Sequence, residues 1–290
     1  MSEYFETSSR IGRGMAKRSL DLIEAMRQIA EAMQPITGRG VGYKLFAQYL
    51  IASMSESEMA KVYRLLLIAR EQGIIPWAWI VEEGRILERV PQWTDPAEYA
   101  ECVARSYRRD FWTQQPHRVQ VWSEKGTVRS VLKPVLVHYG VDFQPVGGFS
   151  SGTKAHDIAE DDDGRPLIVL YVGDYDPSGL CMSERDLPAR FIKYKGGHIK
   201  LKRIALTRQQ VRRLPSFPAA DKKADTRYKW FVANYGHHCW ELDAMNPRDL
   251  RDLVEREIKR LIEPTAWARC EVVNRAEQQS LKSILEKWGR

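Results

Sequence analysis

The chain has 290 residues, a length that suits two modest domains or one large one. Its content of 43% hydrophobic and 29% charged residues is typical of a globular protein and excludes a fibrous or disordered chain. No stretch approaches the roughly 20 consecutive apolar residues that span a membrane, and the four cysteines are too widely spaced for a zinc ribbon or a disulfide framework. We therefore expect a cytoplasmic protein with reduced thiols and no membrane partner.

The net charge of +7 comes from the C-terminal part of the chain, where residues 201–290 hold 19 Lys and Arg against 12 Asp and Glu. The segment 195–213 has seven basic residues and no acidic one. Such a strip suits a phosphate polymer, although a solvated basic surface explains it equally well. Its candidates for DNA binding are Lys200, Lys202 and Arg203.

A flexible basic arm is expected over residues 1–18, followed by a first domain over 19–94. Apolar spacing predicts helices over 20–33 and 41–53, and a third over 55–73 that begins with the capping-box sequence SESE. The sequence IIPWAWIVEEGRIL then predicts a strand, a tight turn and a returning strand. Three helices followed by a hairpin is the order of a winged helix-turn-helix, but other small helical domains share it.

The second half of the chain alternates between strands and helices. We expect a connecting helix within residues 95–116, then a domain over 117–290 that ends in a helical extension. RVQVW, VDFQPV and RPLIVLYVG predict strands, and the helix after the first of them closes at Gly140. The last, continuously apolar strand is typical of a parallel sheet covered on both faces, so we expect a mixed α/β fold. The acidic turn at 161–164 lacks the ligand spacing of a calcium loop and is expected to be solvated.

Acidic residues follow two of these strands. Glu124 comes at the end of RVQVW, and Asp174 and Asp176 follow LIVLYV in the sequence GDYDPSG. Because functional groups gather beyond the carboxyl ends of parallel strands, we expect all three carboxylates at one edge of the sheet. They repel one another unless a cation neutralises them, and Mg²⁺ prefers such oxygen ligands. The pattern predicts a Mg²⁺ site; a surface glutamate beside a capped turn is the alternative.

These motifs resemble the Toprim domain of topoisomerases, bacterial primases and several nucleases, over roughly residues 117–192. More narrowly, they resemble the A subunit of topoisomerase VI and its relatives, the meiotic double-strand-break proteins. In that family the glutamate stands in a hydrophobic-x-Glu-Lys setting, matched here by 121–125, and the aspartates lie in Asp-x-Asp-Pro-x-Gly, matched by 174–179.

The same family has a winged helix ahead of its Toprim domain, with Arg-x-x-Tyr-Tyr on a helix and the second tyrosine as nucleophile. Arg39 and Tyr43 match the arginine and the second tyrosine, whereas Gly42 replaces the first tyrosine. The resemblance implies that Tyr43 forms a 5′-phosphotyrosyl link to DNA. Arg39, one helical turn earlier, could stabilise the phenolate and the charged phosphorane. A core tyrosine on an amphipathic helix is the alternative.

The resemblance implies Mg²⁺-dependent cleavage of double-stranded DNA by transesterification, in a nucleoid-associated homodimer that acts with a separate ATPase subunit or without one. Lys44 and Lys125 join the candidates for DNA binding, and Lys125 could instead position Glu124. Two other functions fit the same sequence. One is a Toprim nuclease that hydrolyses DNA and uses Tyr43 only structurally; the other is a DNA-binding protein with an inactive acidic site.

Overall fold

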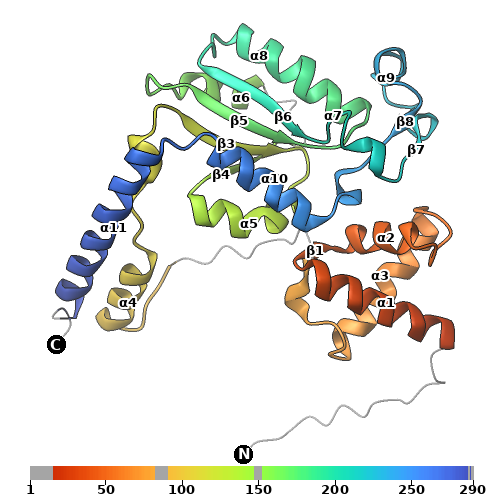
Figure 1. The fold of residues 1–290 in the computed structure, drawn as a ribbon, viewed down its shortest axis with the longest axis horizontal. Coiled ribbons are helices and arrows are strands. Elements are labelled where there is room, and N and C mark those ends of the chain that lie inside the picture. Colours follow the sequence, from red (N-terminus) through yellow and green to blue (C-terminus); the bar gives the residue numbers. More distant parts are fainter. Residues whose placement is uncertain (1–15, 82–90, 147–151, 287, 289–290) are drawn as a thin grey trace, which may run out of the picture. The chain divides into compact units, whose positions relative to one another are not determined.

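The structure is a computed structural model that describes residues 16–81, 91–146, 152–286 and 288 (Figure 1). The chain divides into two compact units, residues 1–80 and 81–290. We had expected the first domain to extend to residue 94. No helix in the described residues is both long and apolar enough to cross a membrane.

The first unit combines three helices with a short two-stranded sheet. Its elements are, in chain order, α1 (Lys17–Met33), β1 (Ile36–Thr37), α2 (Gly38–Ala47), α3 (Glu56–Glu71) and β2 (Ile80–Val81). The strands β1 and β2 pair with each other. Apolar side chains from all three helices, among them Met26, Val41 and Leu65, form one core. The three expected helices are present, and β1, which the sequence analysis did not predict, lies between the first two.

Local contacts place α2 earlier in the chain than the expected range of 41–53. The helix begins at Gly38 because the hydroxyl of Thr37 accepts a hydrogen bond from the Gly40 N–H at 2.9 Å and caps it. It ends at Ala47, two residues before Tyr49, whose backbone takes a left-handed φ of 59°. The apolar pattern beyond Ala47 therefore belongs to an irregular segment.

The segment from α3 onward also departs from the prediction in two details. α3 begins where expected, but the capping box does not form, because the Ser55 hydroxyl bonds to the hydroxyls of neighbouring serines. The expected strand at IIPWAWIV is reduced to Ile80–Val81, since Pro76 leads into a 3-10 turn over Trp77–Trp79. The returning strand of the predicted hairpin lies in 82–90, outside the described residues.

The second unit is built on a four-stranded parallel sheet in the order β4-β3-β5-β6. The strands are β3 (Arg118–Ser123), β4 (Asp142–Pro145), β5 (Leu167–Val172) and β6 (Ile199–Ala205). β5 is buried along nearly all its length, as its continuous apolar run predicted. The expected mixed α/β architecture with a parallel sheet is confirmed.

Helices cover both faces of this sheet (Figure 1). The helices of the unit are α4 (Pro96–Ser106), α5 (Thr127–Tyr139), α6 (Gly152–Glu160), α7 (Pro177–Cys181), α8 (Leu187–Lys193), α9 (Tyr228–Tyr235), α10 (Pro247–Lys259) and α11 (Pro264–Leu285); a small sheet pairs β7 (Phe217–Pro218) with β8 (His238–Cys239). Val121 and Leu170 pack in the core under α5 and α10, whereas Trp122 and Tyr171 pack in the core under α6 and α8. Alternate strand residues therefore feed two separate cores.

The connecting helix is shorter than expected. α4 ends at Ser106, and the chain then runs extended before a 3-10 turn over Phe111–Gln114. The reason is long-range: the backbone N–H of Arg109 donates to the Asn274 side chain on α11 at 2.9 Å. The helix after β3 does close at Gly140, in the left-handed conformation that favours glycine, as predicted.

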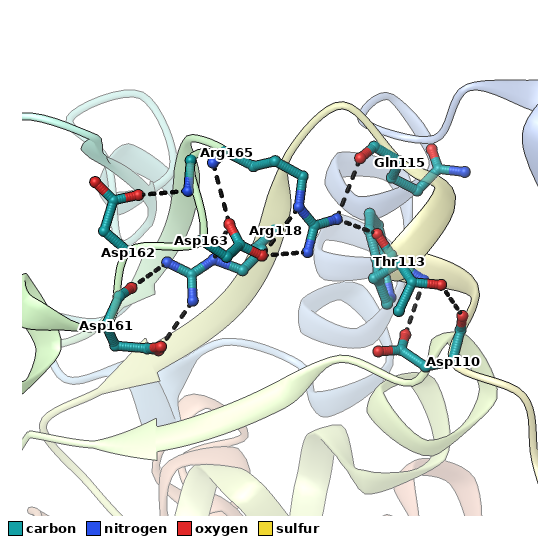
Figure 2. A network of polar contacts seen from close by, with 10 residues as sticks. Asp110, Thr113, Gln115, Arg118, Asp161, Asp162, Asp163 and Arg165 are labelled. Atoms are coloured by element: carbon teal, nitrogen blue, oxygen red, sulfur yellow. Dashed lines mark hydrogen bonds and ion pairs between the residues drawn. The ribbon is translucent and has the colours of Figure 1, made fainter.

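The acidic turn at 161–164 is solvent-exposed, as expected, but its carboxylates also take part in an ion-pair network (Figure 2). Arg118, the first residue of β3, pairs with Asp161 at 2.9 Å and with Asp163 at 3.4 Å. Arg165, just before β5, pairs with Asp163 and donates to backbone carbonyls at the end of the 3-10 turn. The network ties the amino-terminal ends of the two central strands together.

Replacing Arg165 by Met should therefore lower the free energy of unfolding by about 1–3 kcal/mol, because half-buried carbonyl groups lose a charged donor. Chemical denaturation would measure the change. Arg129→Met, at an exposed arginine of α5 whose side chain forms no hydrogen bond or ion pair with the described residues, is the control and should shift stability by less than about 0.5 kcal/mol. Equal losses in the two variants would contradict a stabilising network.

Candidate functional site

The carboxyl ends of the two central strands carry the acidic residues that the sequence singled out. Ser123 of β3 and Val172 of β5 are paired in register in the parallel sheet. Glu124 follows Ser123 directly, Asp174 follows Val172 after one glycine, and Asp176 comes two residues later. We refer to Glu124, Asp174 and Asp176 as the strand-end carboxylates. Their predicted placement at one edge of the sheet is confirmed.

The Asp-x-Asp-Pro-Ser-Gly segment forms a tight turn into α7. The carboxylate of Asp176 accepts a hydrogen bond from the Gly179 N–H at 2.8 Å and caps this helix. A Cβ at position 179 would lie 2.4 Å from the carbonyl oxygen of Asp174, so only glycine fits this turn. The Ser178 hydroxyl donates to Oε1 of Glu124 at 2.8 Å. This bond links the acid that follows β3 to the turn that follows β5.

A segment without a recognisable motif, residues 240–243, completes the site. Tyr175 and Trp240 exchange two backbone hydrogen bonds, of 2.8 and 3.0 Å, in an antiparallel bridge. The backbone N–H of Leu242 donates to Oδ1 of Asp174 at 2.7 Å. The sequence favours a structural role for the acids of this segment, because they precede a helix start at Asn246-Pro247 and nothing indicates that the segment returns to the edge of the sheet.

Lys125 lies at the centre of the site. Its Nζ is 3.0 Å from Oδ2 of Asp174, 3.1 Å from Oδ2 of Asp243 and 3.7 Å from Oε2 of Glu241. Burial alone would lower the pKa of Lys125, but the charges of these carboxylates raise it well above its usual range. The side chain therefore stays charged, and its ammonium group is paired with these carboxylates.

A second lysine repeats this arrangement at Asp176. Nζ of Lys222 lies 3.4 Å from Oδ2 of Asp176, whose other oxygen accepts the N–H of Gly179. Asp174 has the same pair of partners, a backbone N–H on one oxygen and a lysine ammonium on the other. Lys222 lies between β7 and β8 in the chain. This partner of Asp176 therefore also comes from a segment distant in sequence.

The Asp174 carboxylate has a raised pKa. Its side chain is buried, with the residue 7% exposed. Burial raises its pKa to about 6, the positive charge of Lys125 opposes that rise, and the negative charge of Asp176 adds to it. Ionised Asp174 is therefore costly in the folded protein even with Lys125 beside it.

This cost makes stability depend on pH. The folded-state pKa of about 6 exceeds the unfolded value near 3.8, so the folded protein holds the proton more tightly and the free energy of unfolding falls as pH rises between these values. The Asp174→Asn variant keeps an oxygen for the Leu242 N–H and cannot ionise. In EDTA, the stability of the wild type relative to this variant should fall by about 2–3 kcal/mol between pH 4 and pH 7. Urea denaturation at several pH values would measure it; parallel pH profiles would contradict a raised pKa at Asp174.

The strand-end carboxylates have the oxygen donors that Mg²⁺ prefers, and a bound cation would oppose the rise that burial causes in the pKa of Asp174. Among the described residues, however, no three Asp, Glu, His or Cys side chains are gathered closely enough to enclose a metal ion. The positions beside Asp174 and Asp176 are taken by the ammonium groups of Lys125 and Lys222. The donors suit a divalent cation in type, and a cation at Asp174 or Asp176 would have to compete with a lysine.

The basic strip at 195–213 is divided by β6. Arg203 points inward: its guanidinium donates to the backbone carbonyls of Gly173 and Asp174 at 3.0 and 3.1 Å, and burial lowers its pKa. It braces the turn that holds Asp174, so its expected role in DNA binding is corrected. Lys202 is exposed and pairs with Glu257 of α10 at 2.6 Å. Lys200 is exposed on the same strand.

The rest of the strip follows the carboxyl end of β6, at the edge that also carries the acidic site. Arg208, Arg212 and Arg213 are exposed there, and within the described structure none of them forms an ion pair. The sequence groups these arginines with Arg203 in one basic strip. The structure separates them, because Arg203 lies on β6 and points inward whereas the three arginines follow the end of that strand.

In the first unit, α2 carries the residues matched to the tyrosine motif. Cζ of Arg39 lies 5.9 Å from the ring centroid of Tyr43, so the two share a face of the helix as expected. Tyr43 is 4% exposed, and Lys44 is half-buried. A Cβ at Gly42 would lie 2.5 Å from the sulfur of Met59 on α3. The tyrosine that the family has at this position therefore does not fit without movement of Met59.

No family model, curated protein or solved structure matches the chain. The assignment of the site accordingly rests on short motifs and on the geometry described above. The motif residues fall into two groups, Arg39 and Tyr43 in the first unit and the strand-end carboxylates in the second.

Proposed function

We propose that this protein cleaves double-stranded DNA by Mg²⁺-dependent transesterification, with Tyr43 as nucleophile and the strand-end carboxylates as the cation site. The observation that carries the proposal is the meeting of Glu124 with the Asp-x-Asp turn through Ser178. Bound Mg²⁺ would polarise the phosphate and stabilise the departing 3′ oxygen. The order α1-β1-α2-α3-β2 is consistent with a winged helix, and the parallel sheet with acids at its carboxyl edge is consistent with a Toprim domain.

The side chains of α2 would carry out the covalent step. A phenol has a pKa near 10, so the Tyr43 hydroxyl has to lose its proton as its oxygen attacks phosphorus. The Arg39 guanidinium, already over the ring, would stabilise the phenolate and the charged phosphorane. The bond from phosphorus to the 3′ oxygen then breaks, and the 5′-phosphotyrosyl link preserves its energy for resealing. Because Tyr43 is 4% exposed, α2 has to expose the hydroxyl when DNA binds.

The proposal includes further partners. Cutting both strands needs two nucleophiles at a fixed stagger, which a two-fold axis provides, so a homodimer is part of it. The resemblance also implies a separate ATPase subunit, or a form that acts without one. A nucleoid-associated location follows from the DNA substrate.

The decisive assay uses supercoiled plasmid and Mg²⁺, stopped with detergent and run with and without protease. Tyr43→Phe should abolish protein-linked DNA, because it removes the attacking oxygen while keeping most of the packing. Glu124→Gln should abolish cleavage, because it removes a charge at the cation site. Circular dichroism would show that both variants are folded. Cleavage by Tyr43→Phe at the wild-type rate would contradict transesterification.

A second candidate is hydrolysis of DNA by the same acidic site, with Tyr43 in a purely structural role. The low exposure of Tyr43 favours it. In that case Tyr43→Phe cleaves like the wild type, no product depends on protease, and Glu124→Gln is inactive. Binding without cleavage in any form of the protein would instead support the third function, a DNA-binding protein.

The exposed arginines after β6 provide a separate test of DNA binding. Changing Arg208, Arg212 and Arg213 to Ala should weaken affinity for all sequences alike and make the slope of log affinity against log salt shallower by up to about 3, because fewer counterions are released. Lys200→Ala with Lys202→Ala is the comparison, and its effect should be smaller since Lys202 is already paired with Glu257. Fluorescence anisotropy across a salt series would measure both. An unchanged slope in the triple variant would show that these arginines form only a solvated surface.

A further inference from the structure

Lys125 occupies the oxygen of Asp174 that no backbone N–H uses. Oδ1 of Asp174 accepts the backbone N–H of Leu242, and Oδ2 lies 3.0 Å from the ammonium nitrogen of Lys125. A divalent cation at Oδ2 would meet this ammonium at close range, and like charges at that distance repel strongly in a buried site. Lys125 and a divalent cation therefore cannot both remain on Asp174.

A second position for the ammonium group already exists. Lys125 is also 3.1 Å from Asp243 and 3.7 Å from Glu241, which lie on the segment held beside the Asp-x-Asp turn by the backbone bridge between Tyr175 and Trp240. The ammonium group can give up Asp174 and keep these two carboxylates. The required movement is small, because Nζ already lies within ion-pair distance of both carboxylates.

We infer that Lys125 is a built-in competitor of the divalent cation at Asp174, and that its ammonium group transfers fully to Asp243 and Glu241 when the cation binds. The inference rests on the proposed Mg²⁺-dependent function. The lysine neutralises Asp174 in the cation-free protein and sets the concentration at which a cation enters the site. Asp243 acts on the cation only through Lys125, as a positioning residue.

The first test measures the binding of Mn²⁺, as a stand-in for Mg²⁺, to metal-free protein without DNA, from the electron paramagnetic resonance signal of free Mn²⁺. Lys125→Met should lower the Kd at least about tenfold, because the competing charge is gone. Lys202→Met is the matched control: it removes another lysine ion-paired to a glutamate, changes the net charge equally and should leave the Kd unchanged. An unchanged or raised Kd in Lys125→Met would overturn the inference.

The second test is a double-mutant cycle between Lys125 and Asp243. Asp243→Asn alone should raise the Kd, because Lys125 loses its second position and stays on Asp174. In the Lys125→Met background the same change should have little effect. An equal rise in both backgrounds would mean that Asp243 attracts the cation directly, which contradicts the inference.

Folding and the proposed function are controlled within the same experiment. Removal of Lys125 leaves buried carboxylates unpaired, so Lys125→Met alone could fail to fold. The double variant, Lys125→Met with Asp243→Asn, removes part of that unpaired negative charge. Comparing its Kd with the Kd of Asp243→Asn alone then gives the effect of Lys125. A lower Kd in the double variant supports competition, and an equal Kd overturns it. If neither the wild type nor any variant binds Mn²⁺ at millimolar concentration, the cation site itself fails and the inference with it. If the wild type binds Mn²⁺ and cleaves DNA but Lys125→Met does not bind more tightly, only the inference fails.

Discussion

The site depends on one constraint, which is that two neighbouring parallel strands end in the same register and are followed at once by acids. The pairing of Ser123 with Val172 brings Glu124 and the Asp-x-Asp turn to one edge, where the hydrogen bond from Ser178 joins them. Parallel strands direct all their carboxyl ends to one side, so no further device is needed to gather the charges. The other groups of the site offset the repulsion between these charges.

Positively charged side chains of the same protein offset this repulsion. Each aspartate of the turn has one oxygen on a backbone N–H and the other on a lysine, and Arg203 braces the same turn through its carbonyl groups. Even so, Asp174 keeps a raised pKa. A bound cation would offset the cost of ionising this buried carboxylate. Proteins commonly accept such local costs where they perform chemistry.

The same edge of the sheet also organises the basic charge. β6 lies beside β5, and the chain leaves it at the acidic edge with Arg208, Arg212 and Arg213 exposed. Exposed arginines that follow β6 suit the proposed DNA substrate, because its phosphates need counter-charges. Both candidate cleavage reactions need this surface. They differ in whether Tyr43 leaves its buried position on α2.

Short-range pattern was sufficient for much of the fold. The apolar run of β5, the Gly140 end of α5 and the placement of Glu124 and the Asp-x-Asp turn at strand ends are all local signals, and all are confirmed. Contacts between segments distant in sequence decided which side chains complete the site and where the helices end. Lys222 and the 240–243 segment return to the site from elsewhere in the chain. Arg203 turns inward because the turn after β5 offers carbonyl acceptors, and α4 stops early where the chain bonds to α11. Periodicity and capping act within a few residues and are visible in the sequence, whereas the partner of a buried charge is chosen by tertiary packing.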